Sequence, residues 1–211
     1  MGTDNLYWKK KDRASKRKSK NRGKPLPSFL IVCEGEKTEP NYFRSFRLSS
    51  AHVKPVGCGR NTVSLVKKAI EIREKAKIND EIYDQVWCVF DRDSFSPQNF
   101  NEAIVLAGRE GIKAAYSNEA FELWYLLHFN YYDSAFPREK YQKMLSKLLN
   151  HSYDKKSRSM YKELFEKQES AIKNAKKLLN SYKPHNPDKD NPSTTVHKLV
   201  SELNKYLSTG R

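Results

Sequence analysis

The chain has 211 residues, enough for one domain with a hydrophobic core, and no apolar run approaches the roughly 20 residues that a membrane-spanning helix needs. Its 40 lysines and arginines outnumber its 25 aspartates and glutamates, and the net charge of +15 predicts a polyanionic partner, with nucleic acid first. The three cysteines form no C-x-x-C pair and the N-terminal residues include no apolar secretory segment, so we expect a cytoplasmic protein without a zinc site.

The positive charge is divided between the N-terminal residues and the rest of the chain. Residues 1–25 hold ten lysines and arginines against two aspartates, while the rest holds 30 against 23 acidic residues. Because residues 1–26 contain almost nothing to bury, we predict a disordered basic arm there. We expect it to contact nucleic acid through Lys9, Lys10, Lys11, Arg13, Lys16, Arg17 and Lys18. The alternative is that the charge only aids solubility or nonspecific adhesion.

The segment 27–133 alternates between strand and helix patterns. Phe29–Cys33 and Val86–Phe90 are continuous apolar runs, typical of strands buried on both faces, and Ile112–Tyr116 is a third strand candidate. Amphipathic helical segments separate these runs. This alternation predicts an α/β core of mostly parallel strands flanked by helices.

After about Asn130 the strand patterns stop. Residues 138–150 and 158–182 have helical patterns, and a last helix follows the loop "KPHNPDKDNP", with Ser193 or Thr194 as its expected N-cap. We therefore expect residues 134–211 to form a helical C-terminal part packed on the core.

Acidic residues follow the ends of two predicted strands. Glu34, Glu36 and Glu39 come after the first strand, and Asp91 and Asp93 come after the second. If the two strands are neighbours, these carboxylates converge on one edge of the sheet and repel one another, which a divalent cation such as Mg²⁺ relieves. Structural alternatives remain open: the aspartates can cap a turn, Glu39 can favour a helix start, and Lys37 can neutralise a neighbour without metal.

The stretch "LIVCEGEKTEPNYF" followed by "VFDRD" resembles the Toprim pattern, and its E-G-x-(x)-T-E form is closer to that of the overcoming-lysogenization-defect nucleases. The set "CEGEKTEPNYF", "FDRDSF", "SNEAFELWYLLHF" and "NPSTTVHKLV" resembles the RloB-like family of bacterial restriction-modification loci over roughly residues 28–203. One departure is Glu119, where the family pattern leads us to expect a proline after Asn118.

The resemblance implies a Toprim-like core with Mg²⁺- or Mn²⁺-dependent chemistry at phosphodiesters. Matched residue by residue, it implies a catalytic and metal-binding role for Glu34, Asp91 and Asp93, with Glu39 as a further ligand. Lys37 is expected to stabilise charge on the phosphate, and the secondary candidates are Glu36, Arg92 and Glu122.

Three functions are compatible with these patterns. The first is a metal-dependent nuclease acting on DNA or RNA in anti-phage defence or a restriction-modification locus, with other subunits of a defence system as partners. The second is a non-catalytic nucleic-acid-binding accessory protein with a vestigial site. The third is an enzyme that transfers nucleotidyl or phosphate groups to small substrates.

Overall fold

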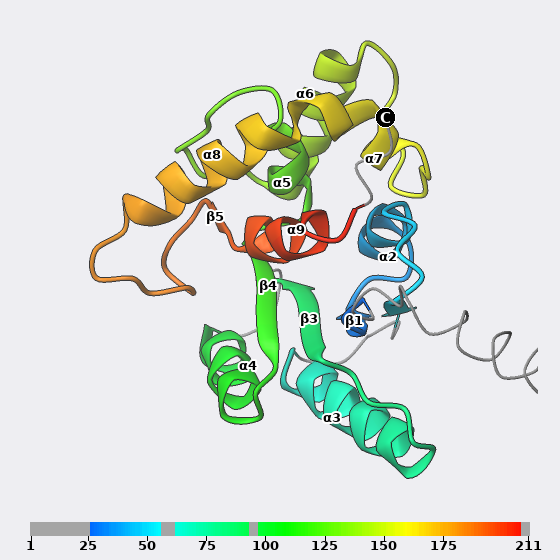
Figure 1. The fold of residues 1–211 in the computed structure, drawn as a ribbon. Helices are drawn as coiled ribbons and strands as arrows, with labels where there is room; N and C mark the ends of the chain where they lie inside the picture. Colours follow the sequence, from blue (N-terminus) through cyan, green and yellow to red (C-terminus); the bar gives the residue numbers. More distant parts are fainter. Residues whose placement is uncertain (1–25, 56–61, 93–96, 208–211) are drawn as a thin grey trace, which may run out of the picture.

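The computed structural model describes residues 26–55, 62–92 and 97–207, and a five-stranded sheet lies at its centre (Figure 1). The strands are β1 (Phe29–Cys33), β2 (Ala51–Pro55), β3 (Gln85–Asp91), β4 (Lys113–Asn118) and β5 (Ser193–Thr194). Their order is β2-β1-β3-β4-β5, and only the short edge strand β5 is antiparallel to its neighbour. The expected α/β architecture with a mostly parallel sheet is confirmed.

The described helices surround this sheet. They are α2 (Thr38–Arg44), α3 (Thr62–Ile78), α4 (Pro97–Arg109), α5 (Glu122–Leu126), α6 (Arg138–Leu149), α7 (Met160–Leu164), α8 (Gln168–Asn180) and α9 (Val196–Asn204), with a 3₁₀ turn at Phe165–Lys167. None of them is both long and apolar enough to cross a membrane.

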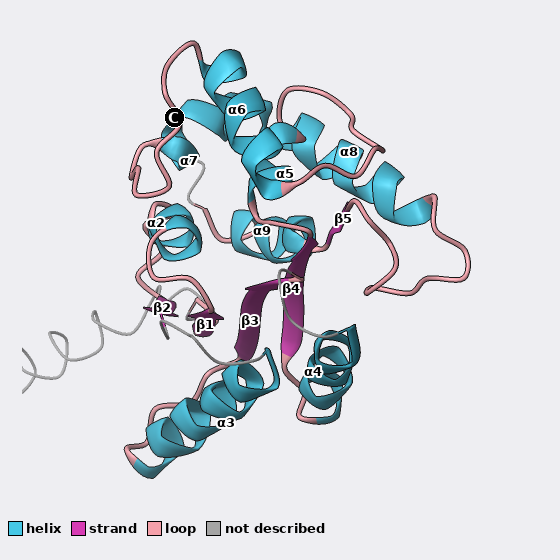
Figure 2. Ribbon diagram, turned by 180° about the vertical axis from the view of Figure 1, so that it is seen from behind, coloured by secondary structure: helices cyan, strands magenta, loops and turns pink. Residues whose placement is uncertain are grey.

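Alternating residues of the central strands form two separate cores. Leu30 and Phe90 pack with α3 and α4 on one face, while Ile31 and Val89 pack with α2, α9 and the other C-terminal helices on the opposite face. Figure 2 shows α3 and α4 on one side of the sheet, and α5, α6 and α8 lying beyond α9 on the other. Both faces are therefore covered, which explains why β1 is apolar at every position.

The C-terminal part differs from the expectation in two respects, both at Ser193 and Thr194. The prediction that no strand follows Asn130 is wrong, because Ser193 and Thr194 pair with Asn118 and Ser117 as β5. The predicted N-cap of the last helix is wrong for the same reason: both residues are extended, so α9 begins at Val196 with Thr195 as N-cap. The Thr194 hydroxyl still accepts a hydrogen bond from the Val196 N–H at 3.2 Å.

Candidate functional site

The carboxyl ends of β1 and β3 lie side by side because the two strands are parallel neighbours. Glu34 follows β1 directly, and its N–H continues the ladder by donating to the Val89 carbonyl at 2.9 Å. Its Oε2 atom accepts a hydrogen bond from the Asp91 N–H at 3.1 Å. The Glu34 side chain therefore reaches the last residue of β3.

Glu39 lies in the first turn of α2, and its side chain is buried. The carboxylate occupies the space beside Gly35, where a Cβ atom would overlap Oε2 of Glu39. Burial raises the pKa of Glu39 to about 7; the Glu122 carboxylate also raises it, while Arg138 and Lys155 lower it. Glycine at position 35 is thus what admits this buried carboxylate.

Asp91 ends β3 and is only 8% exposed. Its Oδ2 accepts a hydrogen bond from Nη2 of Arg138, the first residue of α6, at 3.0 Å. Its Oδ1 is buried without a hydrogen-bond partner. Burial raises the pKa of Asp91, the nearby Glu39 carboxylate raises it further, and the Arg138 guanidinium opposes both.

Glu122 contributes a fourth carboxylate from the start of α5, a helix buried along its whole length. It is 3% exposed, and its Oε1 accepts a hydrogen bond from the Tyr153 hydroxyl at 3.3 Å. The Lys155 ammonium lies 3.8 Å from the same oxygen. Glu122 is close enough to Glu39 and Asp91 to raise the pKa of both. We name Glu34, Glu39, Asp91 and Glu122 the carboxylate cluster.

The sequence analysis missed the three residues that balance this cluster: Arg138, Tyr153 and Lys155. The segment that carries Tyr153 and Lys155 is fixed on α2, because Thr38 donates to the Lys155 carbonyl at 3.2 Å and Asn41 donates to the next carbonyl at 3.0 Å. Arg138 is detectable only as the first residue of a predicted helix. No spacing in the sequence relates these residues to strand ends so far away in the chain.

The remaining predicted site residues are not members of the carboxylate cluster. Glu36 and Lys37 have exposed side chains, and Arg138 and Lys155 supply the positive charge beside the carboxylates. Arg92 pairs with Asp188 through Nε and Oδ1 at 2.6 Å, which ties the loop before β5 to the end of β3. Asp93 and the basic arm lie outside the described residues.

The donor chemistry of the carboxylate cluster fits a hard divalent cation, because carboxylate oxygens are the ligands that Mg²⁺ prefers. The unpartnered Oδ1 of Asp91 is consistent with such a ligand. As the side chains stand, no group of three or more potential ligands among the described residues is arranged to hold a metal ion. Arg138 and Lys155 provide positive charge at Asp91 and Glu122 instead.

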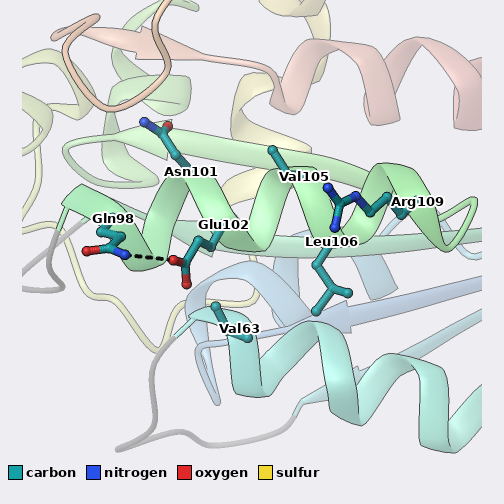
Figure 3. Close-up of a pocket in the computed structure, with 7 residues that line it drawn as sticks. All are labelled: Val63, Gln98, Asn101, Glu102, Val105, Leu106 and Arg109. Atoms are coloured by element: carbon teal, nitrogen blue, oxygen red, sulfur yellow. Dashed lines mark hydrogen bonds between the residues drawn. The ribbon is translucent and has the colours of Figure 1, made fainter.

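A separate groove of about 560 Å³ lies between α3 and α4, on the face of the sheet opposite α2 (Figure 3). Among the described residues that line it, the carboxylate is Glu102, which accepts a hydrogen bond from Gln98 at 2.9 Å. The lining residues are Val63, Gln98, Asn101, Glu102, Val105, Leu106 and Arg109. It shares no residue with the carboxylate cluster.

Comparison with known protein families identifies a match. The family model described as RloB-like protein matches residues 29–203, which include every residue of the carboxylate cluster and all five strands. Searches of curated proteins and of solved structures returned no match. Because this family model spans most of the length of the chain, the chain belongs to the RloB-like protein family.

Proposed function

We propose that the protein is a metal-dependent nuclease that hydrolyses phosphodiester bonds of DNA or RNA at the carboxylate cluster. The observation that carries the proposal is the convergence of four carboxylates from separate segments, with one buried oxygen of Asp91 left without a hydrogen-bond partner. Crowded, buried carboxylates disfavour their own ionisation, and a divalent cation reverses that preference. The net charge of +15 supports a polyanionic substrate.

In this proposal, the carboxylates bind metal and the basic residues bind phosphate. Glu34, Glu39, Asp91 and Glu122 would hold Mg²⁺ or Mn²⁺, with Asp93 as a further candidate. The bound metal supplies polarisation of the phosphate and a lowered pKa for an attacking water. Arg138 and Lys155 would then pair with phosphate oxygens, which bind a guanidinium and an ammonium as carboxylates do. Lys37 and Arg92 remain candidates for the same role.

The test is cleavage of end-labelled single- and double-stranded DNA and RNA in Mg²⁺ or Mn²⁺, with EDTA as the blank. We expect Asp91→Asn and Glu122→Gln to abolish cleavage. Glu74→Gln, which changes an exposed glutamate of α3, should leave it unchanged. Cleavage that persists in Asp91→Asn would exclude this site.

A second candidate is a nucleic-acid-binding accessory protein with a silent site. It is favoured by Arg138 and Lys155, which already pair with Asp91 and Glu122. Calorimetric titration with Mg²⁺ separates the two functions. A binding heat that disappears in Asp91→Asn supports the nuclease, and the absence of heat in the wild-type protein supports the accessory.

We also propose, on family membership alone, that the protein acts in bacterial anti-phage defence. The test is plaque formation on cells that carry the native locus with wild-type protein or Asp91→Asn. Equal plaque numbers across a phage panel would contradict the role.

A further inference from the structure

A row of aromatic rings in the connection between α5 and α6 lies against lysines of the neighbouring helices. The Lys167 ammonium is 4.2 Å from the ring centre of Phe129, and the Lys177 ammonium is 4.0 Å from that of Tyr131. Lys140 of α6 lies 3.7 Å from the ring centre of Phe136. The rings are only partly buried. We name Phe129, Tyr131, Tyr132 and Phe136 the aromatic strip.

The aromatic strip runs beside α8. Asn174, in the middle of that helix, donates to the Leu127 carbonyl at 2.9 Å and so fixes the start of the connection. Figures 1 and 2 both show the connection lying along α8. Lys167 is the N-cap of this helix and Lys177 lies in its last turn, ten residues further on, or about 15 Å at 1.5 Å per residue.

The excess of positive charge after the basic arm falls in the part of the sequence that carries this strip. Residues 129–183 hold 13 lysines and arginines and six acidic residues, an excess of seven. Residues 26–211 as a whole hold 30 and 23, which is the same excess. The other residues after the basic arm are therefore neutral in sum, and a polyanion is attracted to the helical part that carries the rings.

One end of the aromatic strip adjoins the carboxylate cluster. Arg138 lies between Phe136 and Lys140 in the chain, and its guanidinium contacts Asp91 at 3.0 Å. The Phe136 end of the strip is therefore two residues from a side chain that contacts Asp91.

We propose that the aromatic strip binds single-stranded nucleic acid, with bases stacked on the rings and phosphates paired with Lys140, Lys167 and Lys177. Only the direction of the strand, toward the carboxylate cluster, rests on the proposed nuclease function. An exposed lysine–ring contact favours association by about two- to five-fold, whereas a stacked base contributes about five- to 150-fold. A base therefore displaces the ammonium from the ring, and the flexible lysine stays within reach of the adjacent phosphate.

The test uses the full chain in EDTA, with fluorescein-labelled oligothymidine, oligouridine and a DNA duplex of equal length, read by anisotropy. Phe129→Leu and Tyr131→Leu keep the net charge and the apolar packing but remove the rings. We expect each to weaken both single-stranded complexes by about five-fold or more and to leave duplex binding unchanged. Tyr83→Leu removes a partly exposed ring just before the amino end of β3 and serves as the matched control.

The charged partners give a second measurement. Lys167→Gln and Lys177→Gln should each reduce the slope of log affinity against log salt by about 0.7 for single strands, whereas Lys75→Gln on α3 should not. Thermal melting checks that every variant is folded.

The proposal is overturned if the ring variants leave single-strand binding unchanged, or weaken single strands and duplex equally, because charge alone would then explain binding. Since these assays contain no metal, they do not depend on cleavage. Ring-dependent binding without cleavage supports this proposal and contradicts the nuclease function. Cleavage without ring-dependent binding supports the nuclease function and contradicts this proposal.

Discussion

The Asp91 N–H donates a hydrogen bond to Oε2 of Glu34 at 3.1 Å, across 57 residues of sequence. The side chain that directly follows β1 therefore satisfies the backbone donor of the last residue of the neighbouring strand β3. Glu34→Ala leaves that donor unsatisfied, and we expect it to lower the free energy of unfolding by about 1–3 kcal/mol. Glu34→Gln keeps an acceptor oxygen, so it should unfold near the wild-type urea concentration while losing metal-dependent cleavage. Equal stability of the alanine and glutamine variants would contradict the structural role of this bond.

Gly35 allows the Glu39 carboxylate to lie against the backbone. Gly35→Ala should displace this carboxylate but keep the fold, because only the end of a flexible side chain has to move. We expect a melting temperature close to that of the wild type and a weaker Mg²⁺ affinity in calorimetry. Gly108→Ala is the control, since a Cβ atom there meets nothing within 4 Å. Unchanged Mg²⁺ affinity in Gly35→Ala would place Glu39 outside the metal site.

The raised pKa of Glu39 makes stability depend on pH. Burial raises this pKa from 4.5 to about 7, so between those values the folded protein holds a proton that the unfolded chain releases. The contribution of Glu39 to stability is therefore fully present below about pH 4.5 and is lost as the pH rises through about 7. Without metal, Glu39→Gln should lessen this fall by up to about 3 kcal/mol.

The measurement is urea unfolding at pH 5 and pH 8 in EDTA. The raised pKa of Asp91 acts in the same direction. Burial lowers the pKa of His128 and of His197 to about 4, which acts in the opposite direction, so the effect of Glu39 is the difference between the wild type and Glu39→Gln. Glu169→Gln, an exposed change on α8, serves as the control. A change in stability between pH 5 and pH 8 that is the same in Glu39→Gln and in the wild type would disprove the assignment.

Arg138 is the positive charge beside Asp91, and its side chain is 26% exposed. Arg138→Gln should destabilise the protein, by less than the roughly 3–5 kcal/mol of a fully buried pair, because Asp91 can take up a proton. Added Mg²⁺ should raise the melting temperature of Arg138→Gln more than that of the wild type, since the cation replaces the missing charge. Arg138→Lys keeps the charge and should respond less. An equal Mg²⁺ response in all three proteins would show that Arg138 and metal do not share Asp91.

The sequence was sufficient for β1, β3 and β4 of the sheet and for the carboxylates of the site, but not for β5 or for the positive charges. The sequence predicted buried strands at Val86–Phe90 and Phe29–Cys33, because short continuous apolar runs are typical of strands that are covered on both faces. Their parallel pairing then brought Glu34 and Asp91 together. By contrast, β5 has only two residues, Ser193 and Thr194, which is too short to leave a pattern.

The local order of apolar and acidic residues by itself determined where the buried strands β1 and β3 form and which carboxylates follow them. Such patterns can be predicted from the sequence because they depend only on residues that are neighbours in the chain. The counter-charges were decided only by tertiary structure. Arg138 and Lys155 lie far along the chain from Asp91, and they reach the carboxylates because α6 and the segment after it pack over α2 and α5. Such contacts depend on how helices pack in three dimensions, and no spacing within the sequence encodes them.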